Sequence, residues 1–81
     1  MKLPRSLGGE ELATHLGKYG YQVVRQTGSH IRLTSTYKST EHHLTVPRHK
    51  PLRVGTLNSV INEVAAYLEI EKQNLIDDLF G

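Results

Sequence analysis

Apolar residues recur at helical spacing in two stretches of the chain, residues 9–19 and residues 55–68. In the first stretch, the apolar positions are Leu12, Ala13, Leu16 and Tyr19. In the second, they are Leu57, Val60, Ile61, Val64 and Leu68. Gly20 stands where a glycine commonly ends a helix, and Thr56 is the predicted N-cap of the second stretch. The pattern therefore predicts two amphipathic helices.

The segment between the two predicted helices has the composition and alternation of β-strands. Residues 21–25 include two β-branched residues and one aromatic residue, and residues 29–34 and 42–46 alternate apolar with polar side chains. The polar residues 35–41 are predicted to form a hairpin loop, and Pro47 ends the third run. Three antiparallel strands follow from this pattern.

The predicted sheet has two faces of different character. One face is aliphatic, and the other carries His30, Arg32, Thr34, His43 and Thr45. Such a division is usual for a sheet that is covered on one side only. We therefore predict an α+β fold, a two-layer α-β-β-β-α arrangement with the helices on the aliphatic face of a three-stranded antiparallel sheet.

After the second helix, the helical pattern breaks near residues 69–70, and a short acidic segment follows. The apolar residues of this segment are Leu75, Ile76, Leu79 and Phe80. We predict a short C-terminal helical extension over about residues 71–80. With 81 residues, the chain is predicted to form a single domain, residues 1–81, with its core at about residues 8–70 and the extension as an appendage.

The net charge of +2 is small, but the charges are unevenly distributed. Residues 12–62 hold seven lysines and arginines, one acid and all five histidines, which gives this span a charge of +6. Residues 63–81 hold five acids and one lysine, a charge of −4. The basic central span indicates a polyanionic partner, with nucleic acid as the first candidate. A solvated charged surface explains the charge alone equally well.

Several functional classes find no support in the residues. The chain has no cysteine, which excludes disulfides and thiolate metal sites and fits a cytoplasmic protein. No apolar run reaches the roughly 20 residues of a membrane span, so no membrane partner is expected. His42 and His43 are neighbours in a strand and point to opposite faces, and no His-Glu-x-x-His helix is present. No metal site is therefore predicted.

The turn Gly28-Ser29-His30 is the segment that could hold a catalytic residue. Its histidine lies between Arg25 and Arg32, and the unperturbed pKa of histidine, about 6.5, lets it take or give a proton near neutral pH. Ser29 and His30 do not form a nucleophilic triad, because adjacent strand residues alternate in direction and no aspartate is nearby. A β-turn followed by a surface histidine is the structural alternative for these three residues taken alone.

A histidine on the open face of a basic sheet suits phosphodiester transesterification in RNA. The 2′-hydroxyl is an internal nucleophile, so the protein needs only a proton acceptor or donor and cations that hold the phosphate. DNA lacks this hydroxyl, so the chemistry selects RNA. His30 is the predicted catalytic residue, and no cofactor is expected. The predicted RNA- and phosphate-binding residues are Lys18, Arg25, Gln26, Ser29, Arg32, Arg48, His49 and Lys50.

Four short motifs in the chain resemble a known family. They are Lys18-Tyr19-Gly20-Tyr21, Arg25-Gln26-x-Gly28-Ser29-His30, Val46-Pro47-x-His49 and Leu52-x-x-Gly55-Thr56-Leu57. In this order, over about residues 8–75, they resemble the HicA toxin family (YcfA-like). The resemblance implies a fold similar to the double-stranded-RNA-binding domain, an mRNA interferase activity, a HicB-type antitoxin as partner and a catalytic role for His30. A rather long 35–41 loop and the acidic tail after Ile70 depart from the family pattern.

Two other functions remain open at this point. A non-catalytic RNA-binding module of the same fold would use the basic side chains and would gain nothing from His30. An interaction domain would use the acidic tail to bind a partner or a second copy of the chain. The sequence favours the ribonuclease toxin, because that function also uses the histidine.

Overall fold

A computed structural model describes residues 3–81 of the chain. Its elements, in chain order, are α1 (Gly9–Leu16), the 3₁₀ turn η1 (Gly17–Tyr19), β1 (Gln22–Gln26), β2 (His30–Ser35), β3 (His42–Pro47), α2 (Val54–Leu68) and α3 (Lys72–Phe80). The predicted α-β-β-β-α order with a C-terminal helical extension is confirmed. The predicted strands differ from the observed ones by a single residue at one or both ends.

The three strands form one antiparallel sheet in the order β1-β2-β3, so β1 and β3 are its two edges. The pairing of β1 with β2 is irregular, because Val23 pairs with Leu33 but Arg25 pairs with Arg32. Val24 is therefore the extra residue of a β-bulge. All five residues of β1 are exposed to solvent.

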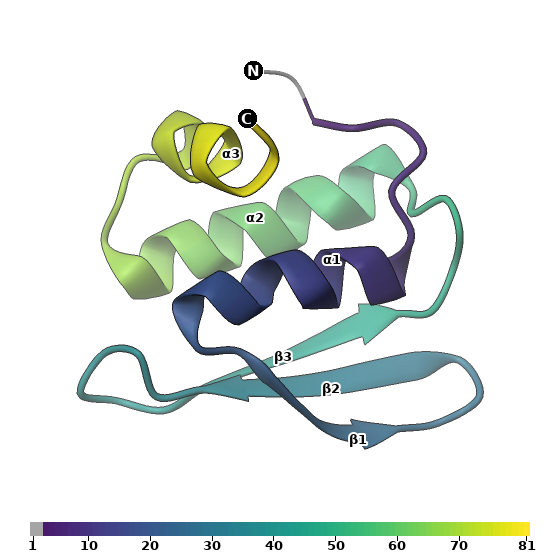
Figure 1. The fold of residues 1–81 in the computed structure, drawn as a ribbon, viewed down its shortest axis with the longest axis horizontal. Helices are drawn as coiled ribbons and strands as arrows, with labels where there is room; N and C mark the ends of the chain where they lie inside the picture. The colour runs from purple at the N-terminus through teal and green to yellow at the C-terminus, as the bar shows by residue number, and fades with distance from the viewer. Residues whose placement is uncertain (1–2) are drawn as a thin grey trace.

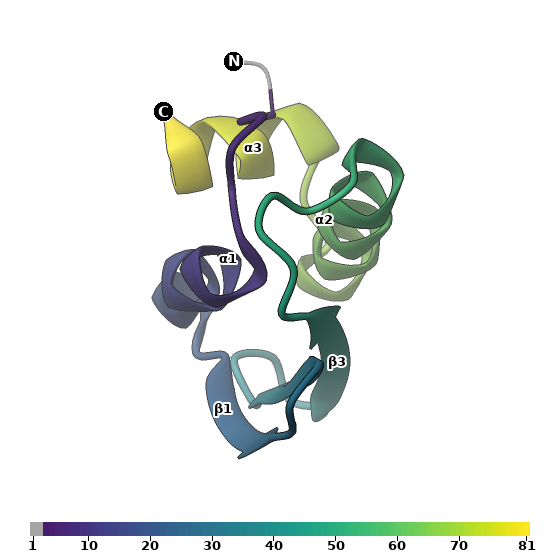
Figure 2. The ribbon, with the colours of Figure 1, turned by 90° about the vertical axis from the view of Figure 1, so that its right-hand side faces the viewer.

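The helices lie on one face of the sheet and leave the other face open. Figure 1 shows α1 and α2 above the sheet, with α3 on the far side of these two helices. Figure 2 shows α1 above β1 and α2 above β3. The α+β class and the predicted covered and open faces are therefore confirmed. No helix in the described part of the chain is long and apolar enough to cross a membrane.

The core lies between the sheet and the helices, as the alternation of β2 and β3 predicts. The buried strand residues are Ile31, Leu33, Leu44 and Val46. Helix α3 also contributes to this core, because Leu75, Ile76 and Leu79 are buried in the same cluster as the apolar residues of α1 and α2. The C-terminal segment is thus part of the same core as the elements before it.

Two helix ends differ from the sequence-based expectation. The predicted first helix continued to Tyr19, but α1 ends at Leu16 and tightens into η1 before Gly20, which adopts the left-handed conformation with φ 77°. The predicted N-cap of α2 at Thr56 is wrong. Arg53 has extended backbone angles and its carbonyl accepts a hydrogen bond from the Leu57 amide at 3.0 Å, so the helix begins one turn earlier.

A close approach at Gly9 fixes the start of α1 against the end of β3. The Gly9 amide donates to the His49 carbonyl at 2.9 Å, and a Cβ on Gly9 would lie 1.9 Å from the Pro47 carbonyl oxygen. Only glycine fits this contact. The contact sets where the segment after β3 runs, and it thereby places Arg48 and its neighbours.

Candidate active site

The β1–β2 turn holds His30 at the start of β2. The Thr27 amide donates to the His30 carbonyl at 2.9 Å, and the His30 amide donates to the Thr27 hydroxyl at 3.1 Å. Gly28 lies at the tip of this turn, and nothing in the chain comes within 4 Å of the position that a Cβ would occupy there. The turn thus presents His30 from a fixed backbone, next to open space.

The His30 side chain is exposed and has one hydrogen-bond partner in the described chain. Its Nδ1 lies 3.0 Å from the Ser29 hydroxyl, which leaves Nε2 facing outward without a partner. If the serine hydroxyl donates to Nδ1, it stabilises the tautomer in which Nε2 carries the proton. If the hydroxyl accepts a hydrogen bond from Nδ1, Nε2 is left as an acceptor. Ser29 therefore lies where it can orient the imidazole.

Arg25 and Arg32 form a pair of cations beside His30. They are direct partners across β1 and β2, so their side chains leave the sheet on the same, open face. Neither has an ion-pair or hydrogen-bond partner among residues 3–81. Arg32 is two residues from His30 on the same face of β2, roughly 7 Å away along the strand. The structure therefore brings His30, Ser29, Arg25 and Arg32 together.

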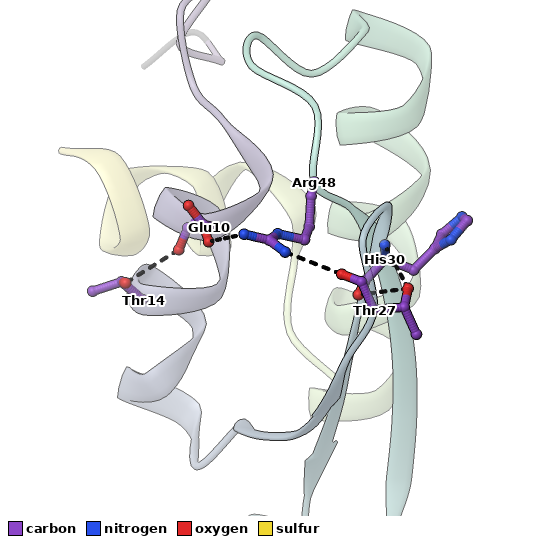
Figure 3. Close-up of polar contacts among 5 residues, drawn as sticks. All are labelled: Glu10, Thr14, Thr27, His30 and Arg48. Atoms are coloured by element: carbon purple, nitrogen blue, oxygen red, sulfur yellow. Dashed lines mark hydrogen bonds and ion pairs between the residues drawn. The ribbon is translucent and has the colours of Figure 1, made fainter.

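Arg48 does not join this group. Its guanidinium donates to the Thr27 carbonyl and to the Glu10 carboxylate, each at 3.0 Å, and so ties the turn to the start of α1. Figure 3 shows the His30 imidazole pointing away from the Arg48 guanidinium. Arg48 therefore supports the turn from the helical side, and its guanidinium lies apart from the His30 imidazole.

The remaining predicted cations are held on the helical side. Lys50 pairs with Glu11 at 3.2 Å, and hydrogen bonds from the Gly8 amide and Lys50 lower the pKa of the Glu11 carboxyl. Lys18 pairs with Asp78 of α3 at 2.9 Å. The Lys18 ammonium therefore lies in the helical layer.

Gln26 and His49 also lie apart from His30. Gln26 pairs with Ile31, whose side chain is in the core, so its own side chain starts from the covered face of the sheet. His49 is exposed, and its carbonyl accepts the Gly9 hydrogen bond at the start of α1. Of the eight predicted binding residues, the structure thus gathers Arg25, Ser29 and Arg32 around His30.

Comparison with protein-family models matches residues 9–65 to the HicA toxin of bacterial toxin–antitoxin systems. The chain belongs to the HicA toxin family. The match runs from the start of α1 into α2, and it includes the turn and the paired arginines. Helix α3 lies outside the matched residues of this HicA chain. Comparison with curated proteins and with solved structures gives no match.

A hollow beside His30 in this HicA chain was missed by the sequence reasoning. It has a volume of about 520 Å³ and lies between β3 and α2. Its polar side chains are His30, His43, Thr45, Thr56, Ser59 and Glu63. The signal was present in the sequence, because Thr56, Ser59 and Glu63 have the spacing of a polar stripe on one side of α2.

His42 has a structural role that the sequence reasoning also missed. Its Nδ1 lies 2.6 Å from the Tyr21 hydroxyl, its Nε2 lies 3.3 Å from the Glu63 carboxylate, and its ring stacks on Tyr67. Burial raises the pKa of the Tyr21 hydroxyl, so the neutral phenol is the form that meets His42. The position of His42 in β3, in phase with Leu44 and Val46, could have shown that it faces the covered side.

Among the residues that the structure describes, no group of three or more histidine and acidic side chains is placed to hold a metal ion. His42 and His43 do take opposite faces of β3, His42 toward Tyr21 and Glu63 and His43 toward Thr34 and Glu41. The candidate site of this HicA chain therefore consists of a histidine and two neighbouring cations, groups that are able to exchange a proton and to bind an anion.

Proposed function

We propose that this HicA-family toxin is an endoribonuclease that cleaves mRNA by transesterification. The observation that carries the proposal is the exposed His30 imidazole, which contacts Ser29 and lies beside two cations that have no partner among residues 3–81. An mRNA substrate would place this activity in the cytoplasm. Family membership supports the toxin role, and the arrangement around His30 supports the type of reaction.

In the proposed reaction, the phosphate lies over the open face near Arg25 and Arg32. His30 Nε2 takes the proton of the 2′-hydroxyl, the 2′-oxygen bonds to phosphorus, and the bond from phosphorus to the 5′-oxygen breaks. A proton from the imidazolium or from water goes to the leaving 5′-oxygen, so a 2′,3′-cyclic phosphate and a 5′-hydroxyl result. The two guanidinium groups hold the non-bridging oxygens and stabilise the charge that develops on them.

The proposed protein partner is an antitoxin of the HicB type that covers the open face. Such a partner would present carboxylates to Arg25 and Arg32, because their charges are not neutralised within the described chain. Complementary charge of this kind speeds association and sets the orientation of the complex. An antitoxin that binds an Arg32→Glu variant with unchanged affinity would dock elsewhere.

The test of the proposed function is His30→Ala, with His15→Ala as the matched control. His15 is exposed on α1 and contacts Phe80, on the helical side of the molecule. We expect His30→Ala to reduce the cleavage rate by about 10²–10⁴-fold and to relieve growth arrest, because this is the usual contribution of general acid–base catalysis. His15→Ala should retain cleavage. The thermal unfolding midpoint of His30→Ala should match that of the wild type, since its side chain is exposed.

Two results would contradict the proposal. If His30→Ala cleaves RNA at the wild-type rate, the histidine takes no part in the reaction. If the wild-type protein binds RNA but leaves it intact, the protein is an RNA-binding module of the same fold and the basic face serves recognition alone.

A further inference from the structure

The hollow between β3 and α2 adjoins the proposed reaction centre. His30 forms part of its wall, and β3 is an edge strand, so the hollow opens along the free side of the sheet. Its volume of about 520 Å³ is within the usual range for small-ligand sites. Buried Leu44 and Val60 supply apolar surface at its base. The His30 end of the hollow therefore lies beside the position proposed for the reacting phosphate.

The α2 side of the hollow carries groups that can form hydrogen bonds with a ligand. Thr56, Ser59 and Glu63 line it over a length of roughly 10 Å, at the helical rise of 1.5 Å per residue. The hydroxyls of Thr56 and Ser59 make no hydrogen bond within the described chain. Glu63 makes one ion pair, at 3.3 Å to His42, which leaves further acceptor positions on its carboxylate.

Charge distinguishes the α2 side of the hollow from the open face of the sheet. Arg25 and Arg32 lie on the open face, whereas Glu63 is the acidic residue of the hollow. A phosphate is attracted to the arginines and repelled by the carboxylate. An RNA strand would therefore run with its backbone on the open face and turn a base into the hollow.

His43 closes the end of the hollow near Glu63 with a ring whose nitrogens are already engaged. Its Nδ1 lies 3.0 Å from the Thr34 hydroxyl, and its Nε2 lies 2.9 Å from the Glu41 carboxylate. The imidazole can therefore offer a ligand little besides its ring face. Stacking on such a ring is a common way for proteins to hold an unpaired RNA base.

From these features we propose that the hollow binds a single unpaired nucleobase next to the cleaved bond, with Glu63 as the residue that selects guanine. This inference rests on the proposed ribonuclease function. Guanine presents two adjacent donors on its Watson–Crick edge, N1–H and the N2 amino group, which match the two oxygens of one carboxylate. Adenine and cytosine place an acceptor beside their amino group, and uracil presents one donor between two carbonyls.

The test compares base preference in Glu63→Gln and Glu71→Gln. A single-stranded RNA pool with randomised bases is cleaved, and the product ends are sequenced. For the wild type, we expect guanine to be enriched at one fixed position beside the cleaved bond. Glu63→Gln should lower this enrichment about tenfold, because glutamine offers one acceptor oxygen in place of two. Glu71→Gln makes the same change of charge at an exposed position on the helical side and should keep the enrichment.

A second measurement does not depend on cleavage or on the Glu63→Gln variant folding. Guanosine and uridine are titrated into the wild-type protein, and the amide resonances of β3 and α2 are followed by NMR. Guanosine should shift the resonances of Ser59 and Glu63, and Ser59→Ala should weaken the response, whereas uridine should have a smaller effect.

The outcomes separate the two proposals. Cleavage without base preference, or with the same preference in Glu63→Gln, would overturn the guanine site and leave the ribonuclease intact. A wild-type protein that cleaves no RNA would overturn the ribonuclease itself. A hollow that responds to an antitoxin peptide and not to guanosine is a protein-binding groove, which would also overturn the guanine site.

Discussion

The positively charged side chains on the two sides of the molecule differ in their partners. On the helical side, Lys18, Arg48 and Lys50 each meet a carboxylate of the same chain. On the open face, Arg25 and Arg32 lie directly opposite each other, and neither contacts a carboxylate in the part of the chain that the structure describes. Cations of both kinds look alike in the sequence. The contrast indicates that Lys18, Arg48 and Lys50 stabilise the folded chain. Arg25 and Arg32, in contrast, are available to a partner.

Energetics support this distinction. Like charges directly opposite each other across two strands destabilise a sheet, so the arginine pair opposes folding. The exposed ion pairs of the helical side contribute little individually, about 0–1 kcal/mol each for pairs of this kind. The apolar residues beneath these ion pairs provide most of the stability. The open face therefore bears a cost that a bound anion would offset.

The largest expected effect comes from the core beneath the helical side. Leu75 of α3 is fully buried, so Leu75→Ala should cost about 2–5 kcal/mol of unfolding free energy. In a domain of this size, each kcal/mol lowers the midpoint of thermal unfolding by about 4–8 °C. The neighbouring Asn74 is exposed, and Asn74→Ala should leave the midpoint nearly unchanged. Equal midpoints for both variants would show that α3 is not part of the stable core.

An intermediate effect is expected for RNA binding. In a His30→Ala background, which keeps the RNA intact, Arg32→Ala should reduce the slope of log affinity against log salt by about 0.7, the value for one contact with a single strand. Lys18→Ala removes the same charge from the helical side and should leave the slope unchanged. If Arg32→Ala and Lys18→Ala change the slope equally, the open face and the helical side do not differ in their contact with RNA.

The smallest effect concerns the contact between α3 and η1, in which Asp78 binds Lys18 and Tyr19. We call this contact the clasp. Hydrogen bonds from the Tyr19 hydroxyl and the Lys18 ammonium lower the pKa of the Asp78 carboxyl. A carboxyl whose pKa is lower in the folded state stabilises the fold above its unfolded pKa, about 3.9, and loses this contribution as the pH falls through the folded value. Asp78→Asn should therefore lower the unfolding midpoint slightly at neutral pH, and the difference should vanish toward about pH 2.

The control for this clasp is Glu69→Gln, at an exposed position for which the described residues offer no ion-pair partner. It should change the unfolding midpoint by less than Asp78→Asn at neutral pH. A constant difference between wild type and Asp78→Asn across the whole pH range would mean that the carboxylate charge is not what holds α3.

The tyrosine of the same clasp responds at the other end of the pH scale. Burial and the hydrogen bond to Asp78 raise the pKa of the Tyr19 hydroxyl to about 12. The neutral hydroxyl is the form that the fold favours, so its contribution is complete below about pH 10 and is lost as the pH rises toward 12. The clasp is therefore intact across the neutral range.

The sequence was sufficient for features that depend on local periodicity. The order of the elements, the two faces of the sheet and the exposure of His30 follow from alternation in β2 and β3 and from the 3.6-residue repeat of the helices. The position of Arg25 does not follow from such a rule. Without the bulge at Val24, Arg25 would share the face of Val23, which pairs with Leu33 on the covered side. The bulge turns it to the open face.

Other features depend on contacts between distant parts of the chain. Lys18 and Asp78 are 60 residues apart, and Arg48 and Glu10 are 38 residues apart. No local pattern shows that these acids are the partners of those cations, so the sequence predicts phosphate binding for Lys18 and Arg48 as it does for Arg25 and Arg32. The hollow likewise forms only where α2 packs beside β3, although the residues on its helical side are regularly spaced.

The bulge in β1 also bears on how the protein behaves at high concentration. Val23 and Val24 are 46% and 62% exposed on an edge strand, which makes this edge prone to pair with the same edge of another molecule. The bulge interrupts the regular ladder that such pairing requires, and Arg25 brings a positive charge to the same edge. Salt screens that charge. Colloidal stability should therefore decline as ionic strength rises, and storage at low salt should keep this protein dispersed.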